Sequence, residues 1–434
     1  MKIVKRMRKF EPKIGLPLLR LQWSFFLLTL EARCAQLTIA WWTLTETGSI
    51  AQFSVMAGAA MAAEILAKPL LGWMGDTYCK IKLVRYGNLL MLVSATLTLW
   101  LSTIAFQPVW LALCMIVSGI VVGLRDPLQS SIIPELAPPA EITRAFQSKT
   151  MLWSIALVMG PGLAGLLLSN TSITSIFFLS VFLVLIASAL VPTGASSRAS
   201  RSPVQEQSST AWPRGFDILT SGFSVVYRVR MERYLAIFSM AINFFLAPFF
   251  VLVVPFYVRE AAGLAPWYAG LLDASFGVGI LLGSRGVPET LKPKAPRDLQ
   301  IKIGFFLLGI NLLALGTGVN VWWLPLFFLL GGIGLVWINV NAAVVRSLAT
   351  PLAYRNRLIA TVAFISQCAS PIGNLIVGGG VELYGAYITT TIAGSTLVLL
   401  VVLLNFVPDL SRIMRMPDAE LPDVYRKIYP DAFN

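Results

Sequence analysis

The 434-residue sequence contains no histidine, and its four cysteines lie at scattered positions (Cys34, Cys79, Cys114 and Cys368). The absence of histidine excludes histidine ligation of metals, Ser–His and Cys–His nucleophilic catalysis, and histidine proton relays. The cysteine spacing matches neither a metal site nor a disulfide framework. We therefore expect no metal, no cofactor and no enzyme activity, and any proton chemistry must use carboxylates.

Charged residues are also scarce. They make up 13% of the chain, whereas hydrophobic residues make up 56%. Soluble globular domains carry about 25% charged residues, so this composition is typical of a membrane protein. Apolar runs of about 20 residues recur along the chain, and each is long enough to cross a bilayer as a helix. The sequence predicts an all-α integral membrane protein with about twelve transmembrane helices.

The formal net charge is +13, and its distribution indicates membrane topology rather than nucleic-acid binding. Basic residues gather before the first apolar run and in every second loop, as with Lys80, Lys82 and Arg85, while the alternate loops hold almost none. This pattern is typical of an even number of helices with both chain termini in the cytoplasm.

The order of apolar and polar stretches divides the chain into five parts. We expect a cytoplasmic basic leader, a six-helix bundle, a cytoplasmic linker, a second six-helix bundle and a cytoplasmic tail, at residues 1–17, 18–191, 192–233, 234–408 and 409–434. The linker is rich in Ser, Pro, Gln and Arg, and its second part, from Arg214 to Arg233, has the composition of an amphipathic helix on the membrane surface.

The two predicted bundles resemble each other in sequence. Leu348-Ala349-Thr350-Pro351 followed by Arg355 repeats Leu136-Ala137-Pro138-Pro139 followed by Arg144 at a similar distance from a later Gly/Pro stretch. A parallel repeat of six helices places substrate sites between the halves, near the middle of the membrane.

A loop motif organises the first bundle. Gly72 and Asp76 precede Lys80 and Lys82 between two long apolar runs. The glycine lets helices approach closely, and the aspartate is placed where the N-terminus of a neighbouring helix can hold it. We interpret these four residues as a gating motif.

This loop resembles the loop motif of the major facilitator superfamily, with Thr77 in place of the usual arginine and Cys79 in place of the second glycine. Other stretches resemble the exporter branch that includes the enterobactin exporter and macrolide efflux proteins: Thr47-Gly48-Ser49, Ile133-Pro134-Glu135-Leu136, Gly160-Pro161-Gly162-Leu163-Ala164-Gly165 and Val254-Pro255-Phe256-Tyr257-Val258-Arg259. Gly160, Pro161 and Gly165 form the helix-packing motif of this group.

The resemblance implies alternating access and export of a small organic molecule, coupled to proton entry, by a monomer in the bacterial inner membrane. A siderophore or a drug-like compound is the leading substrate class. The expected partners are the substrate, protons and the lipid bilayer, without nucleic acid. A lipid translocator of the lysophospholipid type is the alternative within the same fold, and a membrane-embedded sensor is the alternative from another class.

Charged residues inside the predicted helices are the candidates for function, because a charge at a helix centre costs at least about 2.5 kcal/mol on insertion scales. Glu31 is our candidate for the proton-carrying acid; a permanent pair with a basic residue of another helix is the alternative. Arg33 follows two positions later and points to a different helix face, so we expect one of the two to face the cavity. Arg33 is also a candidate for binding substrate.

Three further charged residues inside predicted helices are candidates for coupling or substrate binding. Arg125 is a candidate for binding an anionic substrate group or for holding Glu31 ionised, and its neighbour Asp126 is a second candidate for proton coupling. Glu64 is a third, although an ion pair with Lys68 one helical turn away is the favoured interpretation.

The second half has amides where the first has charges. Asn243 falls near the repeat position of Glu31, and we predict that Asn243 and Asn341 bind substrate. Asp273 is the lone acid of its helix. It is either a second proton site or an exposed residue at a helix start, and we favour the exposed position.

Overall fold

The structure is a computed structural model, and it describes residues 15–71, 74, 78–138, 141–192, 222–284 and 295–433. Gly72 and Asp76, two of the predicted gating residues, therefore lie outside the described residues. Almost all of the described chain is helical, as the recurring apolar runs predict.

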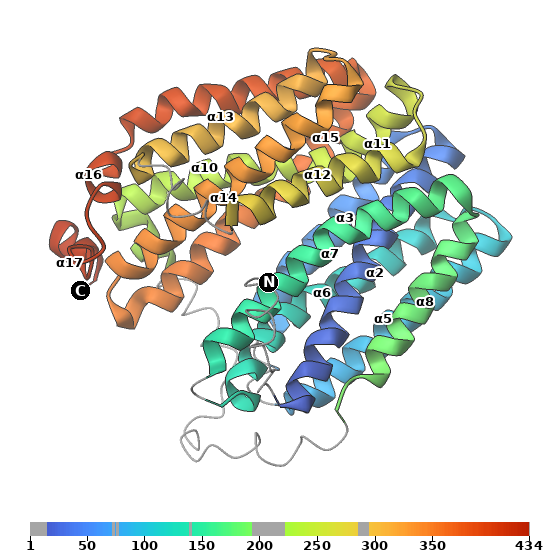
Figure 1. Cartoon of the computed structure of the whole chain (residues 1–434), viewed down its shortest axis with the longest axis horizontal. Coiled ribbons are helices and arrows are strands. Elements are labelled where there is room, and N and C mark those ends of the chain that lie inside the picture. The colour runs from blue at the N-terminus through green and yellow to red at the C-terminus, as the bar shows by residue number, and fades with distance from the viewer. Residues whose placement is uncertain are drawn as a thin grey trace, which may run out of the picture.

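The first half of the chain forms one bundle of long helices, drawn in blue to green in Figure 1. Its helices are α2 (Leu16–Thr47), α3 (Ile50–Leu71), α5 (Lys80–Ile104), α6 (Pro108–Leu136), α7 (Ile142–Asn170) and α8 (Ile173–Ala189). Gly48 ends α2 with a left-handed φ of 65°, a conformation that favours glycine because a Cβ would clash.

The second half forms the other bundle, from yellow-green to red (Figure 1). Its helices are α10 (Arg230–Pro248), continued by η3 (Phe249–Val253), α11 (Val254–Phe256) and η4 (Tyr257–Ala261), then α12 (Pro266–Ser284), α13 (Arg297–Gly316), η5 (Val321–Trp323), α14 (Leu324–Ala349) and α15 (Leu352–Leu403). Gly385 has a φ of 82° inside α15 and divides it into two helices at a sharp bend.

Eight of these helical stretches are long and apolar enough to cross a membrane by length and composition, within the described residues. One of the eight, Arg357–Phe406, contains the two helices that meet at Gly385. The helices α2, α8 and α12 are absent from this group: α8 is shorter, and α2 and α12 carry Glu31, Arg33 and Asp273 inside otherwise apolar sequence.

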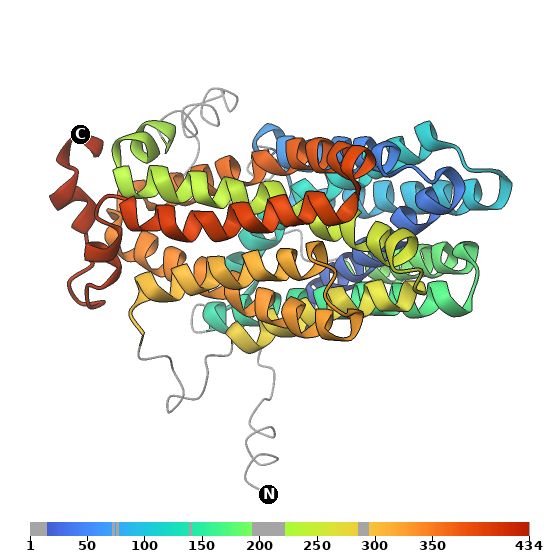
Figure 2. The same ribbon diagram turned by 90° about the horizontal axis from the view of Figure 1, so that it is seen from above.

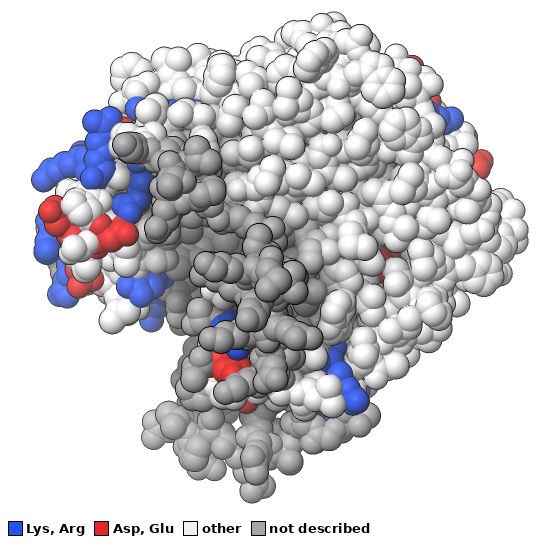
Figure 3. All heavy atoms as spheres, viewed as in Figure 1, with Lys and Arg blue, Asp and Glu red and all other residues white. Residues whose placement is uncertain are grey.

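The two bundles differ in how closely they approach at their two ends. We call the end that holds α16 (Leu410–Met414) and α17 (Val424–Ile428) the tail end, and the opposite end the distal end. Figure 1 shows the ribbons of the two bundles meeting toward the distal end and diverging toward the tail end, and Figure 2 shows the same bundles from above. Charged side chains gather at the tail end, and the flank facing the viewer in Figure 3 is mostly uncharged.

Two pairs of helices join the bundles, and both pairs use small residues. A Cβ added to Gly378 of α15 would lie 2.3 Å from the Cβ of Ser54 in α3. A Cβ on Gly165 of α7 would lie 2.8 Å from the carbonyl oxygen of Pro266 at the start of α12, and one on Gly270 would lie 2.5 Å from the carbonyl oxygen of Pro161. The backbones therefore approach closely, as they do in membrane helix interfaces built from small residues.

The C-terminal tail, which the sequence predicts as a separate cytoplasmic segment, packs on the second bundle. The side chains of Leu410, Ile413, Leu421 and Val424 are buried. Tyr425 donates a hydrogen bond to Glu232 Oε1 at 2.7 Å, and burial, followed by the charge of Glu232, raises the pKa of its phenol well above the usual range. The sequence signal for this packing is the apolar spacing of the tail.

Glu232 is the centre of this tail-end contact. It is fully buried at the start of α10 and accepts a hydrogen bond from Arg346 Nε of α14 at 2.8 Å. Glu232→Ala leaves Arg346 buried without its counter-charge, and we expect a loss of about 3–5 kcal/mol of stability. Thermal unfolding in detergent measures this loss, with Glu420→Ala on the exposed tail as the control. Equal melting temperatures for the two variants would contradict the assignment.

Candidate functional site

A cavity of about 770 Å3 lies between the two bundles. It is lined by α2, α3, α5, α6, α7 and α8 from the first half and by α10, α12, α14 and α15 from the second. Its volume is in the range of small-molecule sites. The position agrees with the expectation of a site between two halves of a repeat.

The two walls of the cavity differ in chemistry. The first half supplies most of the charge: Glu31, Arg33, Glu64, Lys68, Arg125 and Asp126. The second half supplies a single charged residue, Asp273, with amides, a hydroxyl and aromatic rings: Asn243, Asn339, Gln367, Ser370, Phe250 and Phe276. A ligand with a polar or charged part and an apolar part would fit both walls.

Glu31 lies deep in this cavity. The residue is 3% exposed, and its Oε2 atom has no hydrogen-bond partner among the described residues. The positive charge that acts on it comes from Arg125 on α6. Arg125 Nη2 donates a hydrogen bond to Thr29 Oγ1 at 3.4 Å, which directs the guanidinium toward α2. The carboxylate therefore faces a cation without forming a direct ion pair with it.

Arg33 also lines the cavity, so both Glu31 and Arg33 face it, although their spacing on the helix suggested that one of them would. Two positions on a helix differ by about 200° in direction. Both residues reach the cavity because it extends along two sides of α2, toward α6 and toward α7. Arg33 packs against Gly160 of α7. A Cβ added to Gly160 would lie 2.4 Å from the Cβ of Arg33.

Glu64 and Lys68 form the intrahelical ion pair that their spacing favours, at 3.2 Å. Lys68 has a second role that the sequence did not reveal. Its Nζ donates a hydrogen bond to Gln367 Oε1 of α15 at 2.6 Å, and this contact joins the two bundles across the cavity.

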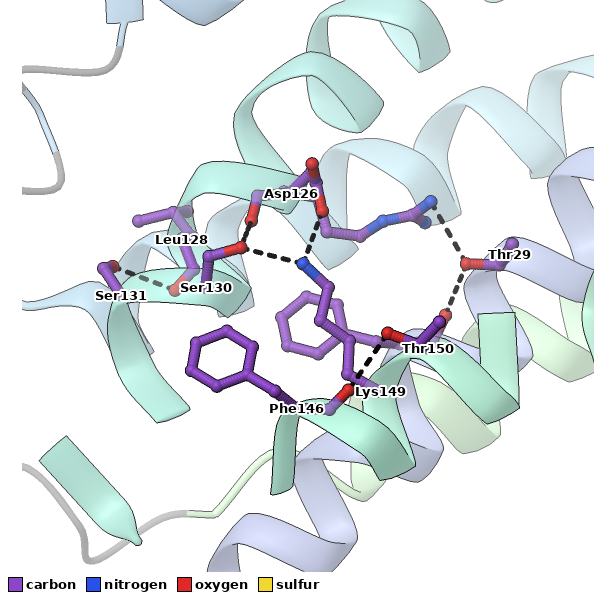
Figure 4. A network of polar contacts seen from close by, with 10 residues as sticks. Thr29, Asp126, Leu128, Ser130, Ser131, Phe146, Lys149 and Thr150 are labelled. Atoms are coloured by element: carbon purple, nitrogen blue, oxygen red, sulfur yellow. Dashed lines mark hydrogen bonds and ion pairs between the residues drawn. The ribbon is translucent and has the colours of Figure 1, made fainter. Parts of the chain in front are cut away.

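Asp126 lies at the edge of the cavity, where its side chain is 70% exposed. Figure 4 shows Lys149 of α7 reaching between Asp126 and Ser130, with Nζ 2.7 Å from Asp126 Oδ1 and 2.8 Å from Ser130 Oγ. Its charge is therefore already compensated, and water reaches it, in contrast to Glu31.

The two predicted asparagines have different positions. Asn243 lines the cavity from α10. Asn341 does not, and this placement corrects the prediction: it donates to Gln300 Oε1 at 3.0 Å and to the carbonyl oxygen of Trp337 at 2.7 Å. Because Asn339 of the same helix lines the cavity, a residue two positions later points about 200° away, toward α13.

Asp273 is the main residue that sequence reasoning misplaced. We favoured an exposed helix start, but Asp273 lies seven residues after Pro266, where α12 begins, and its Oδ1 is buried without a hydrogen-bond partner among the described residues. It lines the cavity. A sequence pattern could have revealed this position. Gly270, Ala274 and Gly277 form a small-residue face of the kind that packs against another helix.

The remaining residues of the gating and helix-packing motifs lie away from the cavity or where helices pack against each other. Lys80 forms an ion pair with Glu135 of α6, and Lys82 is exposed. Pro161 lines the cavity, whereas Gly160 and Gly165 bring α7 against α2 and α12 respectively.

Glu382 could not be predicted as a site residue, because it falls between two predicted helices. Its Oε2 accepts hydrogen bonds from the backbone N–H groups of Ile50 at 3.1 Å and Ala51 at 3.2 Å. A carboxylate of the second half thereby caps the N-terminus of α3 in the first half, where the helix dipole favours negative charge. This contact joins the two bundles at the distal end.

Comparisons with known proteins agree with this architecture. Residues 23–291 match the Major Facilitator Superfamily. The uncharacterised MFS-type transporter YfiS of Bacillus subtilis (strain 168) is 23% identical over 291 residues, which are 63% of this chain and 66% of that protein.

Solved structures share the fold at low sequence identity. A peptide transporter POT in complex with sulfate has a TM-score of 0.70 at 14% identity and covers 92% of this chain and 96% of its own. The nucleoside transporter NupG has a TM-score of 0.71 at 14% identity, over 91% and 100%. A bacterial homologue of the human lysosomal transporter Spinster, inward-facing and occupied, has a TM-score of 0.64 at 14%, over 92% and 98%. The predicted helical membrane fold is therefore confirmed.

Proposed function

Because the chain belongs to the major facilitator superfamily, a family of transporters rather than enzymes, we propose that it is a proton-coupled exporter of a small organic molecule. Transport proceeds by alternating access, in which the two bundles open the central cavity to one side of the membrane at a time. The substrate is a siderophore or a drug-like compound, and the membrane is the bacterial inner membrane with both termini in the cytoplasm.

The observation that carries this proposal is the environment of Glu31. It is a buried carboxylate in the middle of a membrane helix, it has an oxygen without a hydrogen-bond partner, and it faces Arg125 across the cavity. A buried charge of this kind is expensive to keep, so such residues mark ion and proton pathways. In a chain without histidine, a carboxylate is the group that can take up and release the proton.

The cavity supports a coupling cycle with named roles. In one state Glu31 is ionised and balanced by Arg125, and in the other it carries a proton, which makes the cavity more positive. A proton on Glu31 and a positively charged group of the substrate then compete for the negative charge of the cavity. This competition is the simplest way for one site to exchange them in opposite directions.

The proposal is tested by untargeted mass spectrometry of cells with and without the protein. We expect one or a few small organic compounds to accumulate inside cells that lack it and to appear in the medium when it is expressed. An ionophore that collapses the proton gradient should abolish the difference. Cells that express the Glu31→Gln variant are the matched control, because their membranes contain a similar amount of a protein that should not export.

Two results would contradict the proposal. Export that continues unchanged after the proton gradient is collapsed would show that transport is not coupled to protons. A change confined to the lipid fraction would favour translocation of a lysophospholipid, and the charged residues of the cavity would then be contacts for a lipid headgroup.

A further inference from the structure

Four charged residues of the cavity lack a direct ion pair within the described part of the chain. Glu64 is paired with Lys68, and Asp126 with Lys149. The four that remain are Glu31, Arg33, Arg125 and Asp273. Glu31 and Arg125 already have roles in proton coupling. The other two lie on opposite halves, with Arg33 on α2 and Asp273 on α12.

One turn of α7 separates Arg33 from Asp273. Arg33 packs on one side of it, where its Cβ would lie 2.4 Å from a Cβ at Gly160. The residue after Asp273 packs on the other side, where the Cβ of Ala274 would lie 3.9 Å from a Cβ at Gly162. The sequence Gly160-Pro161-Gly162 therefore keeps large side chains out of the space between the two charges. Glu64 and then Asp273 act electrostatically on Arg33, and Arg33 acts on Asp273.

Neither Arg33 nor Asp273 makes all the hydrogen bonds that its charged group can make. Asp273 Oδ1 is buried and has no partner among the described residues. Arg33 donates through Nη1 to Gln36 Oε1 at 3.2 Å, and no carboxylate within the described residues lies in ion-pair contact with it. A guanidinium offers five N–H donors in a fixed fork that matches a carboxylate. Buried charges without direct partners are costly, and a ligand that supplies both partners removes that cost.

We propose that Arg33 and Asp273 form a split recognition site for a zwitterion, in which Arg33 binds the anionic group and Asp273 binds the amine. The apolar body of the ligand then lies along Phe250 and Phe276, which line the same cavity. Because each half supplies one charge, a zwitterion draws the two bundles together, while a ligand with a single charge leaves the other residue uncompensated. The inference rests on the proposed function, and it names the substrate class of that cavity.

Binding to the full-length protein in lipid nanodiscs, without a proton gradient, tests the inference. The probes are the dipeptide Leu-Phe, its N-acetyl derivative, which keeps only the negative charge, and its C-terminal amide, which keeps only the positive charge. We expect the dipeptide to bind at least about tenfold more tightly than either derivative, because each derivative leaves one buried charge unpaired. Thermal stabilisation at millimolar probe concentrations measures the binding.

Variants separate charge recognition from a structural role. In Asp273→Asn the preference for the dipeptide over its N-acetyl derivative should disappear, and in Arg33→Gln the preference over the amide should disappear. The exchange Arg33→Asp with Asp273→Arg should restore the preference for the dipeptide. Glu260→Gln, on an exposed carboxylate beside Arg259, is the control.

No stabilisation by the dipeptide, or equal stabilisation by all three probes, would overturn the inference. Preferences that survive in both single variants would overturn it as well. The outcome is independent of coupling, because binding is measured without a proton gradient. Binding of the dipeptide by a protein that exports nothing would refute the proposed function alone. Proton-coupled export of singly charged compounds would refute only the zwitterion site.

Discussion

Glu31→Gln is expected to abolish proton-driven export and to leave the protein folded. Glutamine has the shape of a protonated glutamate but cannot release a proton, so the variant stays in one of the two charge states of the cycle. The substitution also removes the negative charge that acts on Arg125, which is not in direct ion-pair contact with Glu31. We therefore expect a smaller fall in melting temperature than for Glu232→Ala, where a direct ion pair is broken.

Transport in membrane vesicles measures this effect. Export driven by an imposed proton gradient should fall to the level of vesicles without the protein, while exchange of substrate for substrate, which needs no proton movement, should persist. Glu260→Gln tests whether the loss of any carboxylate has the same effect, and it should leave export unchanged. Gradient-driven export by Glu31→Gln at the normal rate would refute the assignment of Glu31.

Gly378→Leu should shift the carrier away from the arrangement described here. The Cβ of residue 378 would lie 2.3 Å from the Cβ of Ser54, so a leucine cannot fit between α3 and α15 while the bundles meet at the distal end. Overpacking of this kind costs about 1–3 kcal/mol. Because the cost falls on one arrangement of the bundles, the population should shift by about 5- to 150-fold toward the arrangement in which the distal end is open.

Gly379→Leu is a closely matched control, because a Cβ on Gly379 has no atom within 4 Å. Spin labels on the exposed positions Thr45 and Leu383 report the separation of the bundles at the distal end. We expect longer distances and loss of export in Gly378→Leu, with neither change in Gly379→Leu. The same distances in both variants would show that the α3–α15 contact does not control opening.

The sequence was sufficient to predict the helical membrane fold, because it depends on a strong and repeated signal. Apolar runs of bilayer length recur throughout the chain, and almost no other structure satisfies backbone hydrogen bonds in lipid. Glu31 could also be identified as a candidate from the sequence, because an acidic residue in the middle of an apolar run is easily recognised.

Positions around a helix were harder to predict. Asn339 and Asn341 look alike in sequence, and the rotation of α14, which places one on the cavity and the other against Gln300, is set by packing with α12 and α13. Asp273 was misplaced because the start of α12 at Pro266 puts it two turns inside the helix. The packing of the tail depends on Glu232 and Tyr425, which are 193 residues apart.

The most direct test of the account is a measurement of proton movement by the purified protein in liposomes that contain a pH-sensitive dye. When the compound identified by mass spectrometry is allowed to flow down its gradient, the account predicts that protons move in the opposite direction with the unmodified protein and that none move with Glu31→Gln. Flow of the compound without any change in internal pH would contradict proton-coupled export.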